Sequence, residues 1–416
     1  FLKKHRIVKE REQEENKMLQ GKTVLLGVTG GIAAYKMPNV ARMLKKMHCN
    51  VHVLMTQNAT NFITATTFET LTGNKCLIDT FDRNFEFSVE HVALAKQADL
   101  VLLAPATANV IGKIANGIAD DMLTTTVMAC TCKVLVAPAM NHNMYHNSIV
   151  QENLEKLKRH GYEMIDPVCG MLANGDTGDG KLPSEETLVE YVLRELAFEK
   201  DMQGLKVLVT AGPTQEAIDP VRFISNHSTG KMGYAIAKNA MLRGAEVTLV
   251  TGRTALEPPM FVKTVPVTSA KDMYQAVMEC AKEQDIIVKA AAVADYTPAH
   301  TADEKIKKSE GELSLALEKT TDILAELGKN KGNTVLCGFS METEHMLENS
   351  RAKRKKKNLD MIAANNLKQQ GAGFAGDTNV LTLITEDWEK ELALMSKDEA
   401  AKCLLDELLK IKKNKK

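Results

Sequence analysis

A glycine-rich segment, G-V-T-G-G-I-A-A-Y-K at residues 27–36, follows a short apolar run and opens a helical pattern. Small residues at such a junction let backbone N–H groups approach a phosphate, and the dipole of the following helix favours the anion. Many glycine-rich turns are only tight connections, so this signal is weak when taken alone. The G-x-G-x-x-G spacing of dinucleotide sites is absent from the segment, which points to a mononucleotide.

Polar side chains follow at four more places in the first half of the chain. They lie in S-V-E-H-V at residues 88–92, A-P-A-T-A-N at 104–109, P-A-M-N-H-N-M at 138–144 and G-D-T-G-D-G-K at 175–181. The last segment has the glycine-rich composition of a mobile lid. A single histidine or aspartate in such a segment is more often structural or solvated than catalytic. We therefore expect ordinary surface or loop positions for His142, His146, Asp176 and Asp179.

Together these motifs closely resemble the flavoprotein family of cysteine decarboxylases over residues 20–183, with P-x-M-N-x-x-M and G-x-T-G-G-I-A-A-Y-K as the specific matches. The resemblance implies an FMN-dependent oxidative decarboxylation of phosphopantothenoylcysteine, in which a thioaldehyde accepts the electron pair as carbon dioxide leaves. By position, it assigns His91 as the active-site histidine and Asn141 as the holder of the substrate carboxylate. It assigns a substrate contact to Met144 and FMN contacts to Gly30, Gly31, Thr56, Phe62, Ala106 and Thr107.

The lid departs from the family pattern at one position. The family reads A-C-G-x-x-G-x-G and its cysteine supplies the last proton, whereas this chain reads A-N-G-D-T-G-D-G with Asn174 in place of the cysteine. An amide is a poor proton donor, whereas a thiol with a pKa near ~8.5 is a useful one. Cys169, a little upstream, is our candidate for the donor. Two alternatives stay open: another acid serves, or reduction is slow and an enethiol accumulates.

A second group of segments could bind an anion in the other half of the chain. It consists of T-A-G-P-T at 210–214, S-N-H-S-T-G-K-M-G at 225–233, K-A-A-A-V-A-D-Y at 289–296, E-K-I-K-K at 304–308 and R-A-K-R-K-K-K-N-L-D at 351–360. The first two supply backbone amides, hydroxyls and Lys231 near a predicted helix start. The Walker spacing is absent. A charge run is usually a solvated helix face, but two basic clusters at one sheet edge would suit a triphosphate.

Residues 204–409 closely resemble phosphopantothenate–cysteine ligases through G-P-T-x-E-x-I-D-P-V-R-F-I-S-N-x-S-x-G-K-M-G, A-A-A-V-A-D-Y and K-x-K-K. The resemblance implies that CTP, with Mg²⁺, activates the carboxylate of 4′-phosphopantothenate as an acyl-cytidylate, which the cysteine amine then attacks. It gives catalytic roles to Asn226 and Lys305, and leaves the metal ligands unassigned. It gives substrate or nucleotide contacts to Gly212, Arg222, Ser228, Gly230, Lys231, Ala291, Ala292, Asp295, Lys307, Lys308, Phe339, Lys353 and Lys357.

The elements that position these motifs are short apolar runs alternating with helical patterns. Strands are predicted at 22–28, 50–56, 99–107 and 133–140, and the pattern restarts at 205–214, 246–252 and 285–296. The chain is predicted to close as a strand at 380–387 and a helix at 388–410. This alternation predicts an α/β protein with two Rossmann-like, mainly parallel sheets, the first of them flavodoxin-like, and ligands at the carboxyl ends of the strands.

Four segments follow from that pattern. They are a charged extension at 1–17 that we expect to be disordered, a decarboxylase domain at 18–183, a connecting helix at 184–203 and a ligase domain at 204–416. Through the resemblance, the first domain is expected to form trimers and the second dimers, and hence a dodecamer.

Composition narrows the function further. The chain has 416 residues, with 53 basic and 53 acidic side chains, which argues against a nucleic-acid partner. Its 8 cysteines do not form a disulfide framework, and no apolar run reaches the length of a membrane span. The two resemblances together imply a bifunctional enzyme of coenzyme A synthesis whose partners are CTP, 4′-phosphopantothenate and cysteine, and we expect it to be cytoplasmic. The alternative is an active ligase carrying an impaired decarboxylase domain that serves as a flavin-binding scaffold. A pair of NAD(P) dehydrogenases is disfavoured.

Overall fold

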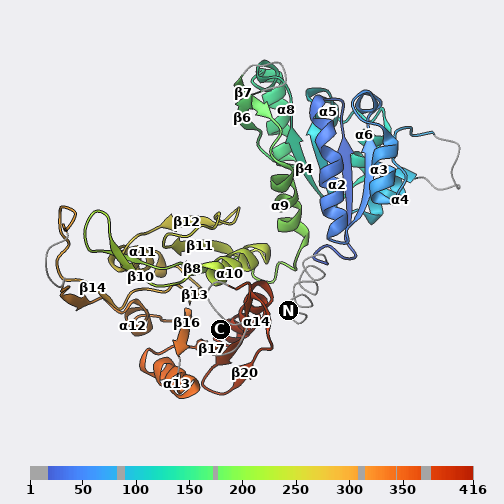
Figure 1. Cartoon of the computed structure of the whole chain (residues 1–416). Coiled ribbons are helices and arrows are strands. Elements are labelled where there is room, and N and C mark those ends of the chain that lie inside the picture. Colours follow the sequence, from blue (N-terminus) through green and yellow to red (C-terminus); the bar gives the residue numbers. More distant parts are fainter. Residues whose placement is uncertain are drawn as a thin grey trace. The chain divides into compact units, whose positions relative to one another are not determined.

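The computed structural model describes residues 17–81, 90–171, 177–307, 314–342, 344–366 and 376–415. The chain divides into two compact units, Phe1–Phe198 and Glu199–Lys416, drawn in Figure 1. Each unit has its own sheet and its own buried core. Within the described ranges, no helix combines the length and the apolar character that a bilayer span requires.

The first unit is built on a parallel sheet with the strand order β2-β1-β3-β4-β5. Its strands are β1 (Thr23–Val28), β2 (Asn50–Met55), β3 (Leu100–Ala106), β4 (Lys133–Pro138) and β5 (Glu163–Met164). The central strands are buried on both faces, which is why they read as continuous apolar runs rather than alternating ones. The predicted parallel α/β architecture is confirmed here.

Helices cover both faces of this sheet (Figure 1). On one side, α2 (Met37–Lys46) packs against α3 (Ala65–Thr72) and α9 (Glu185–Leu196). The other side has a buried apolar cluster supplied in part by α4 (Glu90–Gln97), α5 (Ala108–Ala115), α6 (Met122–Ala129) and α8 (Ser148–Arg159). Smaller elements follow the strands: η1 (Ile32–Lys36), η2 (Gln57–Asn61), α7 (His142–Tyr145) and the antiparallel pair β6 (Val168–Met171) and β7 (Thr177–Lys181).

The second unit has a larger sheet with the order β12-β11-β8-β13-β16-β17-β19-β20. The strands are β8 (Lys206–Ala211), β11 (Glu246–Thr251), β12 (Lys263–Pro266), β13 (Ile286–Lys289), β16 (Val335–Glu342), β17 (Met361–Asn366), β19 (Leu381–Ile384) and β20 (Glu389–Glu391). Strands β12 to β17 of that order pair in parallel, and β19 and β20 add an antiparallel edge. This mainly parallel sheet confirms the second predicted α/β fold.

Five longer helices accompany this sheet in the part of the chain that the structure describes (Figure 1). They are α10 (Lys231–Leu242), α11 (Ala270–Ala281), α12 (Ile323–Lys329), α13 (Met346–Lys356) and α14 (Lys397–Asn414). Helix α10 packs against α14, and α11 packs against α12. Three small antiparallel pairs complete the unit: β9 (Gln215–Ala217) with β10 (Phe223–Ser225), β14 (Tyr296–Pro298) with β15 (Leu317–Lys319), and β18 (Thr378–Asn379) with β21 (Met395–Ser396).

Two predicted elements of this unit differ from the structure. The strand predicted at 285–296 ends at Lys289, because the backbone beyond it bonds to the loop after β8: the Ala292 N–H donates to the Gly212 carbonyl at 3.0 Å. The helix predicted at 388–410 begins only at Lys397, where Ser396 caps its first turn. Residues Glu389–Glu391 instead extend the sheet as β20, because they pair with β19.

Candidate functional site

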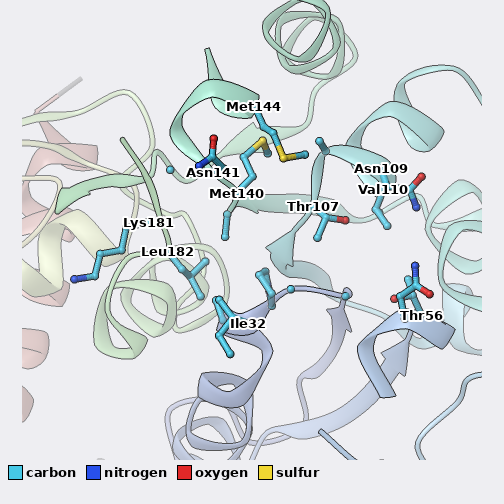
Figure 2. A pocket seen from close by; sticks show the side chains of 18 of the residues that line it. Ile32, Thr56, Thr107, Asn109, Val110, Met140, Asn141, Met144, Lys181 and Leu182 are labelled. Carbon is cyan, nitrogen blue, oxygen red and sulfur yellow. The ribbon is translucent and has the colours of Figure 1, made fainter. Parts of the chain in front are cut away.

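A cavity of about 980 Å³ opens at the carboxyl ends of the strands of the first unit (Figure 2). Each of four neighbouring strands supplies lining residues from the loop that follows it: Gly30 after β1, Thr56 after β2, Thr107 after β3 and Asn141 after β4. Carboxyl ends of parallel strands meet at one edge of a sheet, which explains why segments far apart in the sequence share this cavity. Of the predicted cofactor and substrate residues, Gly31 and Met144 also line it.

The glycine segment forms a cradle that has no room for a side chain at Gly30. A Cβ atom at Gly30 would lie 2.5 Å from the Cβ of Asn58. The neighbouring Thr29 hydroxyl donates to the Pro105 carbonyl at 2.6 Å and accepts from the Thr107 N–H at 3.0 Å. These bonds hold the loops after β1 and β3 together, so the backbone at Gly30 is fixed beside the cavity.

The hydroxyl of Thr56 has no hydrogen-bond partner among the described residues, although its oxygen is buried and the residue lines the cavity. Buried hydroxyls are nearly always hydrogen-bonded, so an unpaired one in a cavity marks a position for a polar atom of a ligand. The cradle and this hydroxyl together fit a mononucleotide-sized group.

The opposite wall carries Asn141, flanked by Met140 and Met144 in Figure 2. The side-chain oxygen of Asn141 caps α7 by accepting from the Asn143 N–H at 2.9 Å. That bond leaves the amide Nδ2 as the donor that the side chain can offer to a carboxylate. The Met140 N–H donates to the Gly180 carbonyl at 3.0 Å, which joins β7 to this wall.

Several residues assigned to the first site from the sequence lie elsewhere in the structure. Phe62 and Cys169 are exposed, Ala106 is buried within β3, and His91 is half-buried on α4; none of them lines the cavity. Asn174 lies outside the described residues. The cavity is also lined by Asn109, from the A-P-A-T-A-N segment, and by residues that the sequence did not single out, among them Asn58 and Lys113. Lys113 has its pKa raised because its ammonium group bonds to Asp120 at 2.8 Å.

In the second unit, three glycines let the loops after β8 and β11 and before α10 touch. Gly212 and Gly230 have φ values of +72° and +79°, and a Cβ atom on either would lie within 3.0 Å of Thr254. A Cβ atom at Gly252 would overlap the carbonyl of Pro213. Next to Gly230, the Ser228 hydroxyl accepts from the Gly230 N–H at 3.3 Å, and Lys231 pairs with Asp377 at 2.8 Å.

The predicted residues Asn226 and Ala292 meet at this place, since the Asn226 amide donates to the Ala292 carbonyl at 3.1 Å. The adjoining Ala291 N–H donates to the Thr210 hydroxyl at 3.1 Å. The structure therefore brings Asn226, Gly212, Ala291 and Ala292 into one hydrogen-bonded region. Asp295 lies just beyond it, where its carbonyl accepts from the Thr320 N–H at 3.0 Å.

Arg222 fastens the lysine-containing loop to the β9–β10 pair. Its guanidinium group bonds to both the Asp219 carboxylate, at 2.5 Å, and the Ile306 carbonyl, at 2.7 Å. The Arg222 guanidinium holds the pKa of the Asp219 carboxyl well below its usual range. Lys305 and Lys307 flank Ile306 and are exposed, so the loop presents both ammonium groups to solvent. Lys308 lies outside the described residues.

A cluster of lysines lies near the ends of β13 and β16. Lys289, the last residue of β13, is buried, and burial together with the charges of Lys357 and Lys353 lowers its pKa to about 7. Burial and Lys357 also lower the pKa of Lys353, whose Nζ lies 3.4 Å from the Phe339 carbonyl. Lys357 pairs with Asp322 at 2.7 Å. Lys289 begins the K-A-A-A-V-A-D-Y segment, but the motif assigned this lysine no role of its own.

Asp295, Asp322 and Glu342 act against this repulsion, but burial and the neighbouring lysine charges outweigh them at Lys289 and Lys353. A polyanion bound beside the cluster would favour the charged forms of both lysines. Predicted nucleotide contacts Phe339, Lys353 and Lys357 are thus gathered at one place, with Lys289 as a fourth member.

Two protein families match the chain, one over each of its two units. Residues 12–197 match the family described as Flavoprotein, and residues 202–411 match the family described as DNA/pantothenate metabolism flavoprotein C-terminal domain. The coenzyme A biosynthesis bifunctional protein CoaBC of Bacillus subtilis (strain 168) is 45% identical over 400 residues, which cover 95% of this chain and 98% of the relative. That of Escherichia coli (strain K12) is 42% identical over 395 residues, covering 94% and 97%. The chain therefore belongs to the family of coenzyme A biosynthesis bifunctional proteins.

Proposed function

We propose that the chain carries out two consecutive steps of coenzyme A synthesis. The second unit ligates 4′-phosphopantothenate with cysteine using CTP, and the first unit decarboxylates the product with FMN. The observation that carries the proposal is the full-length similarity to bifunctional relatives of both kinds of domain. The cavity at the strand ends of the first unit and the lysine cluster of the second provide a binding place for each step.

In the first unit, bound FMN would supply the two-electron oxidation and reduction that the decarboxylation needs. The Gly30 cradle offers its backbone to an anionic or polar group, and the Thr56 hydroxyl bonds to a polar atom of the cofactor. The Asn141 amide donates to the carboxylate of the substrate and fixes its orientation. The thioether side chains of Met140 and Met144 would form the apolar wall beside this carboxylate.

In the second unit, the phosphopantothenate carboxylate attacks the α-phosphate of CTP, and pyrophosphate departs. Negative charge builds up on the phosphate oxygens in that step, and the buried Lys289 with the half-buried Lys353 and Lys357 would offset it. Mg²⁺ would share this task by binding the phosphates. Lys305, on the exposed loop, would stabilise the acyl intermediate. Asn226, which its bond to the Ala292 carbonyl holds in place, would contact the same intermediate.

One incubation of the full chain with 4′-phosphopantothenate, cysteine, CTP and Mg²⁺ tests both steps when mass spectrometry resolves the products. We expect ligated product, then decarboxylated 4′-phosphopantetheine and carbon dioxide. Ligated product without carbon dioxide would instead support the flavin-binding scaffold in the first unit. Absence of ligation would contradict the proposal for the second.

The role of Lys305 can be separated from that of the nucleotide site. Lys305→Ala should abolish ligation while the acyl-cytidylate stays detectable, because activation relies on the lysine cluster and not on this loop. Lys356→Ala, at an exposed position on α13, is the matched control and should ligate normally. Normal ligation by Lys305→Ala would refute its assigned role.

The last proton donor of the decarboxylation is tested at Cys169, which is exposed on β6. If this thiol takes the place of the cysteine that Asn174 replaces, Cys169→Ala should accumulate the enethiol and lose the reduced product. Cys280→Ala, in the second unit, controls for the loss of a thiol. Undiminished reduced product from Cys169→Ala would remove Cys169 from the reaction.

A further inference from the structure

We propose that His142, His146 and Asp179 bind a divalent transition-metal cation, with zinc as the best-suited ion, outside the cavity of the first unit. The structure places one possible ligand atom from each of the three residues within 4.8 Å of the others. The two histidines lie one helical turn apart at α7, and Asp179 lies on β7. The sequence had suggested only ordinary surface or loop positions for all three.

The distances already approach those of a metal site. The Nε2 atom of His146 lies 3.1 Å from a carboxylate oxygen of Asp179. Two ligands bound at ~2.0–2.1 Å to one tetrahedral zinc ion are about 3.3 Å apart, so this pair needs almost no movement. The rings of His142 and His146 are 4.4 Å apart between centroids, edge to face. The candidate ligand atoms all lie within 4.8 Å of one another, so the His142 ring has to move toward the other two to share one ion.

His142 supplies an independent sign of a missing ligand. Its Nδ1 atom is buried and has no hydrogen-bond partner in the part of the chain that the structure describes. Gly178 keeps the space beside this nitrogen open, since a Cβ atom there would lie 2.7 Å from it. A neutral imidazole has one nitrogen with a free lone pair, and a metal ion would use that lone pair.

The ligand set indicates which ions would bind. Two imidazoles and one carboxylate, with water completing the shell, suit Zn²⁺, Co²⁺ and Ni²⁺. Mg²⁺ and Ca²⁺ prefer a shell made only of oxygen atoms, so they should compete poorly. The site therefore differs in kind from the Mg²⁺ proposed to act with CTP in the second unit.

The position of the site points to a structural effect on the cavity. None of the three residues lines the cavity, but their chain neighbours Asn141 and Gly180 do. An ion shared by α7 and β7 would reinforce the backbone bond between Met140 and Gly180, and would hold Asn141 in place. The three residues are thus positioning residues, and the inference does not depend on which reaction the cavity performs.

The test is metal binding by the full chain after treatment with a chelator. Titration with Co²⁺ should produce a visible ligand-field absorption that saturates near one equivalent, and Zn²⁺ should displace it while excess Mg²⁺ should not. His146→Ala and Asp179→Asn should each weaken Zn²⁺ binding measured by calorimetry by at least ~10-fold, since even losses next to a ligand have effects of that size. His160→Ala, at an exposed histidine that ends α8, is the control and should bind as the parent chain does.

Three results would overturn the proposal. They are no saturable Co²⁺ signal in the parent chain, equal Zn²⁺ affinity in the parent chain and both ligand variants, and an equal loss in His160→Ala. Far-ultraviolet circular dichroism of each variant shows whether it is folded. Asn141→Asp, which leaves the three ligands in place, should keep the metal signal and so separates the metal site from the cavity.

Discussion

Replacing Lys289 by methionine should stabilise the second unit, and the gain should depend on pH in a defined direction. Burial lowers the pKa of Lys289 from 10.5 to about 7. At ~1.4 kcal/mol for each pKa unit, holding the charged form in the folded protein costs about 5 kcal/mol at low pH. Methionine has a similar length and no charge, so Lys289→Met removes this cost.

The sign of the pH dependence follows from proton binding. Unfolded chains keep the lysine proton up to about pH 10.5, whereas the folded chain releases it above about pH 7. The cost is therefore complete below pH 7 and disappears as the pH rises toward 10.5. Linkage gives a gain of about 4 kcal/mol for Lys289→Met at pH 7 and about 2 kcal/mol at pH 9.

Urea unfolding of the second unit can be followed alone, because the single tryptophan of the chain, Trp388, belongs to that unit. The free energy of unfolding of Lys289→Met is compared with that of the parent chain at pH 7 and at pH 9. Any repacking cost is the same at both pH values, so it cancels when the two differences are subtracted. Lys356→Met, at an exposed position, should change stability by no more than ~0.5 kcal/mol at either pH. An effect of Lys289→Met that is the same at both pH values would refute the reasoning.

The same residue couples nucleotide binding to protons. At pH 8 a lysine with a pKa of about 7 is mostly neutral, and a triphosphate beside it should restore its charge. CTP binding should therefore take up roughly 0.5–0.9 proton at pH 8. Calorimetry in two buffers of different ionisation enthalpy measures this uptake, and it should vanish in Lys289→Met. Equal uptake by both proteins would place the triphosphate away from Lys289.

Two further predictions concern the other polar contacts. Thr56→Val should weaken FMN binding about tenfold, because the unpaired hydroxyl that lines the cavity is replaced by a methyl group of the same shape. Quenching of flavin fluorescence measures the affinity, with Thr60→Val as control, because the half-buried Thr60 hydroxyl already donates to the Gln57 carbonyl and does not line the cavity. An unchanged affinity of Thr56→Val would mean that Thr56 does not contact the cofactor. Asp219→Asn should raise the KM of the ligation for 4′-phosphopantothenate, since Asp219 accepts bonds from Arg222 and from the Ile306 N–H in the lysine-containing loop. Decarboxylation of added phosphopantothenoylcysteine should be unaffected, and Asp303→Asn, at an exposed position, should show neither effect. The pKa of Asp219 is held low in the folded chain, so its contribution to stability is present above its unfolded pKa of ~3.9 and is lost as the pH falls below that value. If the KM of Asp219→Asn equals that of the parent chain, the bonds from Asp219 to Arg222 and Ile306 are not needed for ligation.

The local patterns of the sequence were sufficient to predict the central strands of both sheets and the edge at which ligands bind. Apolar runs such as 22–28 and 99–107 form β1 and β3 because a parallel strand covered on both faces needs no polar position. Glycine at 30, 31, 212 and 230 marked turns at the ends of strands or the starts of helices, and Gly212 and Gly230 have the positive φ that favours glycine. Because parallel strands expose their carboxyl ends together, the same patterns also predicted where ligands bind.

Other features of the protein depend on contacts between residues that are distant in sequence, and only the tertiary structure determines them. The strand predicted at 285–296 stops at Lys289 because the loop after β8 captures the backbone beyond it. The pKa of Lys289 is set by burial and by Lys353 and Lys357, which no local pattern connects to it. His142 and Asp179 meet only because α7 contacts β7. Periodicity reports which face of an element is buried, whereas charge, partners and cavities arise from which elements are brought together by the fold.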